Sequence, residues 1–214
     1  MTKNNEVSIF DICGTLFFSN TTFDFIVFFH KKKKNTLKWL YSLLLTSFLG
    51  KILNRLSILD VRNTLLWSLK GESRSCLIKV ANDFYDEKLI YKKNHKAFCI
   101  LDLQLEKTNV ILSSASIEPV VYIIANRLGV DYYASELEYD GNWCFAGVFL
   151  NDNLGVKDKA VSIFKVKTVV TDNLSDVNLC LRAENVVVFS KKKNANYWKK
   201  NLKDIDSEII IYDY

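Results

Sequence analysis

Three carboxylates in this sequence follow short apolar runs of the kind that form buried strands. Asp11 comes directly after residues 7–10 in the segment FDICGTL, and Asp172 and Asp176 follow TVVT in the segment DNLSD. An aspartate at a strand end can act as a nucleophile when a metal ion meets its charge. With the neighbouring Asn173, these oxygen donors suit a hard cation such as Mg²⁺, which usually needs only one or two protein carboxylates. The spacing of Asp172 and Asp176 alone also fits helix capping or solvated side chains, but its position after TVVT favours a magnesium site near Asp11.

Hydroxyl and lysine side chains in two other segments could hold an anionic substrate. Ser114 lies near the end of the β-rich run NVILSSAS, where its hydroxyl could bind a phosphate oxygen or simply cap the helix that follows. Lys157 and Lys159 open the next expected helix, where the helix dipole disfavours lysine, although solvent exposure also explains them. We expect one of them to neutralise the substrate's charge. Lys159 is preferred because Ile163 continues the apolar face one turn later, and Lys157 is the alternative.

The elements that would position these residues change character after the first hundred residues. Apolar side chains recur at spacings of three and four through residues 22–100, which predicts helices almost throughout. From residue 109 onward, strand-like and helix-like segments alternate, with a hairpin signal at Asp140-Gly141. We therefore predict an α/β fold with a doubly wound (Rossmann-like) parallel sheet and an inserted α-helical cap.

The same order of elements predicts the domains and the place of the site. Residues 1–18 and 101–214 would form the α/β core domain, and residues 19–100 would form the cap inserted after the first strand. A doubly wound sheet binds its ligands at the carboxyl ends of its strands. Asp11 and Asp172 would therefore meet the hydroxyl segment around Ser114 if the three strands are neighbours.

The composition of the 214-residue chain argues against several classes of protein. Its hydrophobic content of 49% can fill a substantial core. Five cysteines, odd in number and without C-x-x-C pairs, argue against a disulfide framework or a structural zinc site and favour a reducing, cytoplasmic location. No apolar run reaches the ~20 residues of a transmembrane helix. The two histidines, His30 and His95, are expected at a surface or an interface between helices.

Positive charge is concentrated in two lysine runs, residues 31–34 and 191–193, within a net charge of +5. A solvated surface explains such runs, and so does an anionic partner such as a phosphorylated substrate, an anionic lipid surface or nucleic acid. No recognisable nucleic-acid-binding motif accompanies them, so nucleic acid is not expected. Charge alone does not choose among the remaining explanations.

Taken in order, these motifs resemble the haloacid dehalogenase (HAD) superfamily of phosphohydrolases. The resemblance is carried by D-x-x-G-T after the first strand, a hydroxyl residue after the second, a lysine that opens a helix, and D-x-x-x-D after a later strand. It covers essentially the whole chain. The helical insertion after the first motif and the segments SSASIEPVV and ELEYDGNWCFAGVF are similar to those of the phosphoserine-phosphatase-like subgroup with a small helical cap. The resemblance implies a phosphohydrolase that acts on a phosphomonoester.

The resemblance also implies a role for each matching residue. Asp11 would attack phosphorus and become an aspartyl phosphate, and Thr15 would support the turn and the nucleophile. Ser114 would hold a phosphoryl oxygen, while Lys159, or alternatively Lys157, would screen the charge. The substrate-binding residues implied in this way are Gly14, Ser114, Ala115 and Asn173.

Magnesium is the cofactor that the resemblance implies. The carboxylates of Asp11 and Asp172 would bind Mg²⁺ together with the backbone carbonyl of Cys13. Asp176 would orient the ion or its waters. Because only the backbone of residue 13 is required, this site would tolerate a cysteine there.

Cys13 departs from the family's pattern. Most phosphatases of the superfamily carry an aspartate two residues after the nucleophile, which protonates the leaving alcohol and then activates water; such help is worth about 10²- to 10⁴-fold. A thiol, with a pKa of about 8.5, is a poor proton donor beside anions. Three interpretations follow: a phosphohydrolase helped by a good leaving group or by a cap carboxylate such as Asp24, another superfamily reaction such as phosphotransfer, or binding of a phosphorylated ligand or partner without turnover.

The predicted cap is apolar and aromatic and adjoins the lysines at 31–34. Its aromatic side chains can form the core between the cap helices. They can instead meet a lipid-linked or otherwise apolar phosphate through peripheral contact with a membrane surface. A small phosphorylated substrate is the expected partner in either case, and the oligomeric state is not indicated. The aromatic residues concerned are Phe23, Phe25, Phe28, Phe29, Trp39, Tyr41, Phe48 and Trp67.

Overall fold

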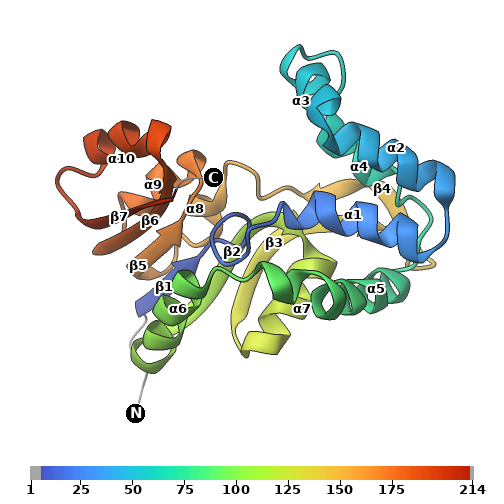
Figure 1. The fold of residues 1–214 in the computed structure, drawn as a ribbon. Helices are drawn as coiled ribbons and strands as arrows, with labels where there is room; N and C mark the ends of the chain where they lie inside the picture. The colour runs from blue at the N-terminus through green and yellow to red at the C-terminus, as the bar shows by residue number, and fades with distance from the viewer. Residues whose placement is uncertain (1–5, 213–214) are drawn as a thin grey trace.

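A computed structural model describes residues 6–212, which contain one seven-stranded sheet (Figure 1). The strand order is β4-β3-β2-β1-β5-β6-β7, and neighbouring strands are parallel except for the pair β3 and β4. The antiparallel pair is the hairpin predicted around Asp140-Gly141. This sheet, with helices packed against it, confirms the predicted α/β class. The strands are β1 (Glu6–Phe10), β2 (Asn109–Ile117), β3 (Asp131–Tyr139), β4 (Phe145–Asn151), β5 (Lys165–Thr171), β6 (Asn185–Lys191) and β7 (Asp206–Tyr212).

Six α-helices separate β1 from β2, where the sequence predicts a helical block. In Figure 1, the first five lie on the side of the sheet that holds β3 and β4, with α3 farthest from the sheet, whereas the sixth runs beside β1 and β2. This last helix packs against β2, so the predicted cap boundary at residue 100 falls inside a helix of the sheet layer. The helices are α1 (Thr21–Lys32), α2 (Thr36–Thr46), α3 (Phe48–Arg55), α4 (Val61–Trp67), α5 (Arg74–Glu87) and α6 (His95–Lys107), with the 3₁₀ turn η1 (Leu89–Lys92) before α6.

The helices after β2 are mostly short. The exception is α7, which ends where Gly129 takes the left-handed conformation, with φ of 68°. The expected helix that Lys157 and Lys159 open has only four residues: the N–H groups of Ser162 and Phe164 bond the carbonyls three residues earlier, so the chain turns before β5. The elements are α7 (Glu118–Leu128), α8 (Lys157–Ala160), η2 (Leu174–Asp176), α9 (Val177–Cys180), η3 (Lys192–Asn194) and α10 (Ala195–Asn201).

The central strand β1 brings the predicted site residues together. Phe10, its last residue, pairs with Leu112 of β2 and with Val170 of β5. The carboxyl ends of β1 and β5 therefore lie side by side, with β2 on the other side of β1. The strands of Asp11 and Asp172 are thus neighbours, as the sequence argument required.

The cap has its own aromatic core. Phe25 and Phe29 of α1 are fully buried, and the ring of Phe25 lies 5.9 Å from that of Phe84 in α5, edge to face. This packing confirms the core interpretation for the aromatic residues of α1. It does not extend to all the aromatic residues of the cap. Those that are exposed include Tyr41, Phe48 and Trp67.

His30 lies at an interface between cap helices, as expected. Its Nε2 lies 2.8 Å from Ser68 Oγ at the end of α4, and the side chain is buried. Burial lowers the pKa of His30 to about 4, so the imidazole is neutral near pH 7. His95, at the start of α6, is exposed.

The cap core predicts a contrast between two phenylalanines. Phe25→Ala should lower the free energy of unfolding by about 3–5 kcal/mol, because it removes a fully buried ring. Phe48→Ala should change it by no more than about 0.5 kcal/mol, because that ring is 77% exposed. Urea unfolding of the two variants measures the difference. Equal losses would contradict this description of the cap.

Candidate active site

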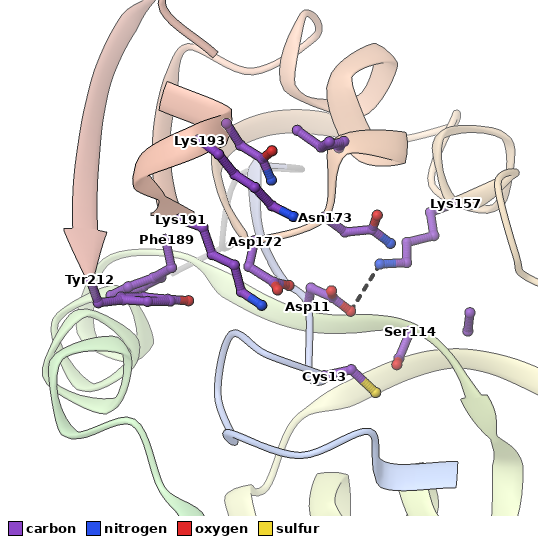
Figure 2. Close-up of a pocket in the computed structure, with 13 residues that line it drawn as sticks. Asp11, Cys13, Ser114, Lys157, Asp172, Asn173, Phe189, Lys191, Lys193 and Tyr212 are labelled. Carbon is purple, nitrogen blue, oxygen red and sulfur yellow. Dashed lines mark ion pairs between the residues drawn. The ribbon is translucent and has the colours of Figure 1, made fainter. Parts of the chain in front are cut away.

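A cavity of about 420 Å³ opens at the carboxyl ends of the central strands (Figure 2). One part of its wall consists of residues predicted from the sequence. The other part comes from the ends of β6 and β7 and from η3. The lining residues are Asp11, Cys13, Ser114, Ala115, Lys157, Asp172, Asn173, Leu174, Phe189, Lys191, Lys193, Asn194 and Tyr212.

Asp11 is held at the end of β1 by backbone and side-chain contacts. Its N–H donates to the carbonyl of Val170 at 2.9 Å, which continues the pairing of β1 with β5. Its Oδ1 accepts a hydrogen bond of 2.8 Å from the N–H of Ile12. These two hydrogen bonds fix the direction of the carboxylate. The residue is also buried, with only 4% of its surface exposed.

Lys157 is the lysine that lies beside Asp11. The sequence favoured Lys159 for this position, and that preference was wrong. Lys157 Nζ lies 2.9 Å from Asp11 Oδ1 and 2.8 Å from Asp176 Oδ2, as part of a buried charge cluster (Figure 2 shows the first pair). Lys159 is exposed. The preference for Lys159 assumed that Ile163 continues a buried helix face, but the helix ends at Ala160 and Ile163 is 80% exposed.

Asp172 is positioned by the loop that follows β1. Thr15 Oγ1 donates to Asp172 Oδ1 at 3.2 Å, so Thr15 supports the second carboxylate. Gly14 has φ of +74°, and a Cβ there would lie 2.2 Å from Asp172 Oδ2. Only glycine permits this close approach. The N–H of Gly14 donates to the carbonyl of Phe17 within the loop, and it is therefore not directed at a substrate.

Asp176 is buried behind the cavity wall. Its Oδ2 accepts hydrogen bonds from Lys157 Nζ at 2.8 Å and from Thr171 Oγ1 at 2.7 Å. The predicted role of orienting a metal ion would therefore be indirect. In the structure, Asp176 positions Lys157.

The three remaining predicted substrate contacts all line the cavity. Ser114 is 1% exposed, and its Oγ accepts a hydrogen bond of 3.2 Å from the N–H of Ser116. Ala115 lies beside it in β2. Asn173 follows Asp172, and its N–H donates to Thr171 Oγ1 at 3.1 Å.

Several lining residues were not predicted as part of the site. Lys191 and Lys193 reach toward the cavity from the side opposite Lys157, as Figure 2 shows. The rings of Phe189 and Tyr212 stack with centroids 5.9 Å apart, and the Tyr212 hydroxyl donates to the carbonyl of Gly14 at 3.0 Å. The sequence signal for these lysines was the lysine run at residues 191–193.

Cys13 lines the cavity, and its thiol contacts two hydroxyl groups. Its Sγ lies 3.0 Å from Thr21 Oγ1 and 3.0 Å from Ser116 Oγ, and these two hydroxyls also hydrogen-bond each other. Burial raises the pKa of Cys13, and the negative charge of Asp11 raises it further. The thiol is therefore held protonated and is a weak acid.

The carboxylates of the cavity carry raised pKa values. Burial raises the pKa of Asp11 to about 6, although the charge of Lys157 opposes the shift. Burial and the charge of Asp11 raise the pKa of Asp172 to about 7. Burial works against protonation of Lys157, but the charges of Asp11 and Asp176 outweigh it and raise its pKa. The cluster therefore has more negative than positive charge to accommodate.

This surplus of negative charge fits a divalent cation at the cavity. Within residues 6–212, no group of three or more His, Cys, Asp and Glu side chains is placed to hold a metal ion. The pair Asp11 and Asp172 nevertheless supplies two carboxylates that face each other in Figure 2. Mg²⁺ needs no larger set when phosphate and water complete its shell. The donors present therefore suit Mg²⁺ bound together with a phosphorylated ligand.

Asp24, the cap carboxylate considered as a substitute proton carrier, lies outside this cavity. Its Oδ2 lies 2.7 Å from Lys92 Nζ and accepts a hydrogen bond from Ser19. It lines a second cavity of about 1100 Å³ between the cap helices. Arg62 forms part of the boundary between the two cavities, because it pairs with Asp152 and donates to the carbonyl of Ala115 at 2.9 Å.

Solved structures share this fold, although no protein-family model and no curated protein matches the sequence. A protein with unknown function from Bordetella pertussis Tohama I matches with a TM-score of 0.78 and 14% identity, over 94% of this chain and 97% of that chain. A HAD-family hydrolase from Salmonella enterica subsp. enterica serovar Typhi matches at 0.62 and 13%, over 90% and 65%. A substrate-bound phosphoserine phosphatase matches at 0.57 and 17%, over 94% and 92%. The chain thus has the fold of HAD-family hydrolases, which confirms the fold that the sequence resemblance implies.

The buried position of Lys157 predicts a large effect on stability. Lys157→Met should lower the free energy of unfolding by about 3–5 kcal/mol, because Asp11 and Asp176 lose their counter-charge. Lys159→Met is the matched control and should change it by no more than about 0.5 kcal/mol. Chemical unfolding at neutral pH tests both. If Lys159→Met were the more damaging change, Lys157 would not be the lysine of the cluster.

Proposed function

We propose that this chain, which has the fold of HAD-family hydrolases, is a Mg²⁺-dependent phosphohydrolase that acts on a phosphomonoester through an aspartyl-phosphate intermediate. The observation that carries the proposal is the fixed carboxylate of Asp11 in one cavity with Lys157, Asp172 and Ser114. A nucleophile, a cation, a metal-binding carboxylate and a hydroxyl donor are the groups that phosphoryl transfer to an aspartate requires.

The proposed reaction has two steps. The carboxylate of Asp11 attacks phosphorus, the ester P–O bond breaks, and the alcohol leaves with a proton from solvent. Water then attacks phosphorus, which releases inorganic phosphate and restores the carboxylate. Mg²⁺, bound by Asp11, Asp172 and the backbone carbonyl of Cys13, would supply charge neutralisation for the phosphoryl oxygens.

Other residues of the cavity would bind the phosphoryl group. Ser114 Oγ would donate its proton to a phosphoryl oxygen, which is compatible with its acceptor role toward Ser116. Lys157 would keep the attacking carboxylate directed and offset its charge. Lys191 and Lys193 would draw the anion into the cavity from the opposite side.

Cys13 lowers the expected rate without removing the site. Its protonated thiol contacts Thr21 and Ser116, where an aspartate carboxylate could accept hydrogen bonds from the same two hydroxyls. Without an aspartate at residue 13 to act as acid and base, the enzyme should act best on esters whose alcohols leave readily. We therefore expect slow turnover that is most visible with activated esters.

The cap supports a substrate whose ester part is partly apolar. The second cavity, adjacent to the first, combines apolar side chains such as Phe23 and Leu59 with the cations Lys51, Arg55 and Arg62. A lipid-linked phosphate has this combination of apolar and anionic parts. We include it in the proposed substrate class of small phosphomonoesters.

Turnover of a panel of phosphomonoesters with Mg²⁺ tests the proposal. Asp11→Asn should be inactive, and chelation of the metal should abolish the wild-type activity. The turnover rate of Cys13→Asp should equal or exceed that of the wild type. The gain should not be larger than the ~10²- to 10⁴-fold that general acid–base catalysis contributes.

Two matched controls accompany these variants. Asp131→Asn and Cys99→Asp alter the same residue types at exposed positions and should leave turnover unchanged. An inactive wild type together with no gain in Cys13→Asp would overturn the proposal and favour a protein that binds a phosphorylated ligand without turnover.

A further inference from the structure

The helices α2 and α3 expose their apolar side chains to solvent. Residues 36–58, which we call the α2–α3 arm, contain ten of the 23 large apolar side chains that are exposed within residues 6–212. Within each of the two helices they recur at helical spacing, and we call the two exposed apolar faces together the stripe. The most regular members of the stripe are Leu37, Leu40, Tyr41, Leu44, Phe48 and Ile52.

Only three residues of the two helices are buried against the protein, and just one of them is a large apolar residue. Ser42 and Leu45 are the buried residues of α2, and Gly50 is the buried residue of α3. A Cβ on Gly50 would lie 1.7 Å from the carbonyl oxygen of Leu45, so α3 packs closely against the end of α2. The packing is therefore specific, and the outward apolar face is not the result of a loosely attached segment.

The arm and the turn before it are strongly basic. Residues 25–59 contain seven lysines and arginines and no aspartate or glutamate, whereas the rest of the chain has 22 basic and 24 acidic residues. All of the protein's net positive charge thus lies in this segment. Among the described residues, only Lys32 and Lys33 of this group form salt bridges, with acidic residues of α5 and the loop before it.

We propose that the α2–α3 arm docks on the surface of a lipid bilayer that contains anionic lipids. Apolar side chains beside cations of which most form no salt bridge among the described residues are complementary to such a surface, where the apolar side chains enter the headgroup region and the cations meet lipid phosphates. Figure 1 shows α3 at the outer end of the cap, away from the sheet, where a flat surface can reach it.

The lengths of the helices favour an interfacial position. α2 has 11 residues and α3 has eight, and no helix within residues 6–212 is long and apolar enough to cross a membrane. Ser47 caps α3 by accepting from the N–H of Leu49, so the two helices are separate elements. Two short amphipathic helices lie along a surface.

A second copy of the chain is a less suitable partner. Contact between two arms would bury the apolar stripes but would bring two acid-free segments, each with seven basic residues, close together. Like charges at an interface oppose association. The charge pattern therefore favours an anionic bilayer.

Vesicle co-sedimentation tests the proposal without reference to turnover. The wild-type protein should sediment with vesicles of equal parts phosphatidylcholine and phosphatidylglycerol, and much less with phosphatidylcholine alone. The triple variant Leu37→Ser, Leu44→Ser, Phe48→Ser should bind the anionic vesicles at least about tenfold more weakly than the wild type. These side chains are 83%, 50% and 77% exposed, so folding should be kept, and urea unfolding verifies this.

Matched variants distinguish binding by the arm from binding by the rest of the protein surface. Leu150→Ser, Ile163→Ser, Leu181→Ser changes three exposed apolar side chains elsewhere and should bind like the wild type. Lys31→Gln, Lys34→Gln should weaken binding more than Lys199→Gln, Lys200→Gln.

Three results would overturn the proposal. They are no sedimentation of the wild type with anionic vesicles, equal binding by the arm variant and its control, and a dimer in light scattering that the arm variant dissociates while vesicles are not bound. The last result would identify a second copy as the occupant of the arm.

Discussion

The arrangement of the site depends on one buried lysine between two buried carboxylates. Lys157 Nζ lies 2.9 Å from Asp11 Oδ1 and 2.8 Å from Asp176 Oδ2, and each of the three side chains is at most 4% exposed. Removing such charges from water costs several kcal/mol per ion unless each finds a well-placed partner. The ammonium therefore fixes α8, the end of β1 and the turn after β5 relative to one another.

The same interaction leaves a charge for the cavity to accommodate. One lysine offsets part of the charge of Asp11 and Asp176, while Asp172 is brought close by Gly14 and held by Thr15. The structure thus keeps two carboxylates facing each other in a buried place. A divalent cation bound there would relieve that repulsion, and under the proposed function a phosphoryl group would then enter a cavity with lysines on both sides. Stability and the proposed chemistry follow from the same set of charges.

The sequence predicted those residues of the candidate site that belong to short local motifs. It missed those that reach the cavity only because distant segments meet. Asp11 and Asp172 were found because each ends an apolar run, and their strands proved to be neighbours. The lysine was misassigned because apolar spacing does not reveal where a helix ends or that Ile163 is exposed. Tyr212 was missed because β7 reaches the cavity only through pairing with β6. For the same reason, periodicity predicted the cap helices but not which apolar face is left uncovered.

The central claim is that Asp11 accepts a phosphoryl group beside a metal ion. A crystal structure of the protein with Mg²⁺ and beryllium trifluoride, a tetrahedral mimic of the phosphoryl group, tests it directly. We expect the trifluoride on the Asp11 carboxylate, Mg²⁺ in contact with Asp11 and Asp172, and Ser114 and Lys157 against the fluorines. An unmodified Asp11 with the trifluoride or the metal bound elsewhere would contradict it.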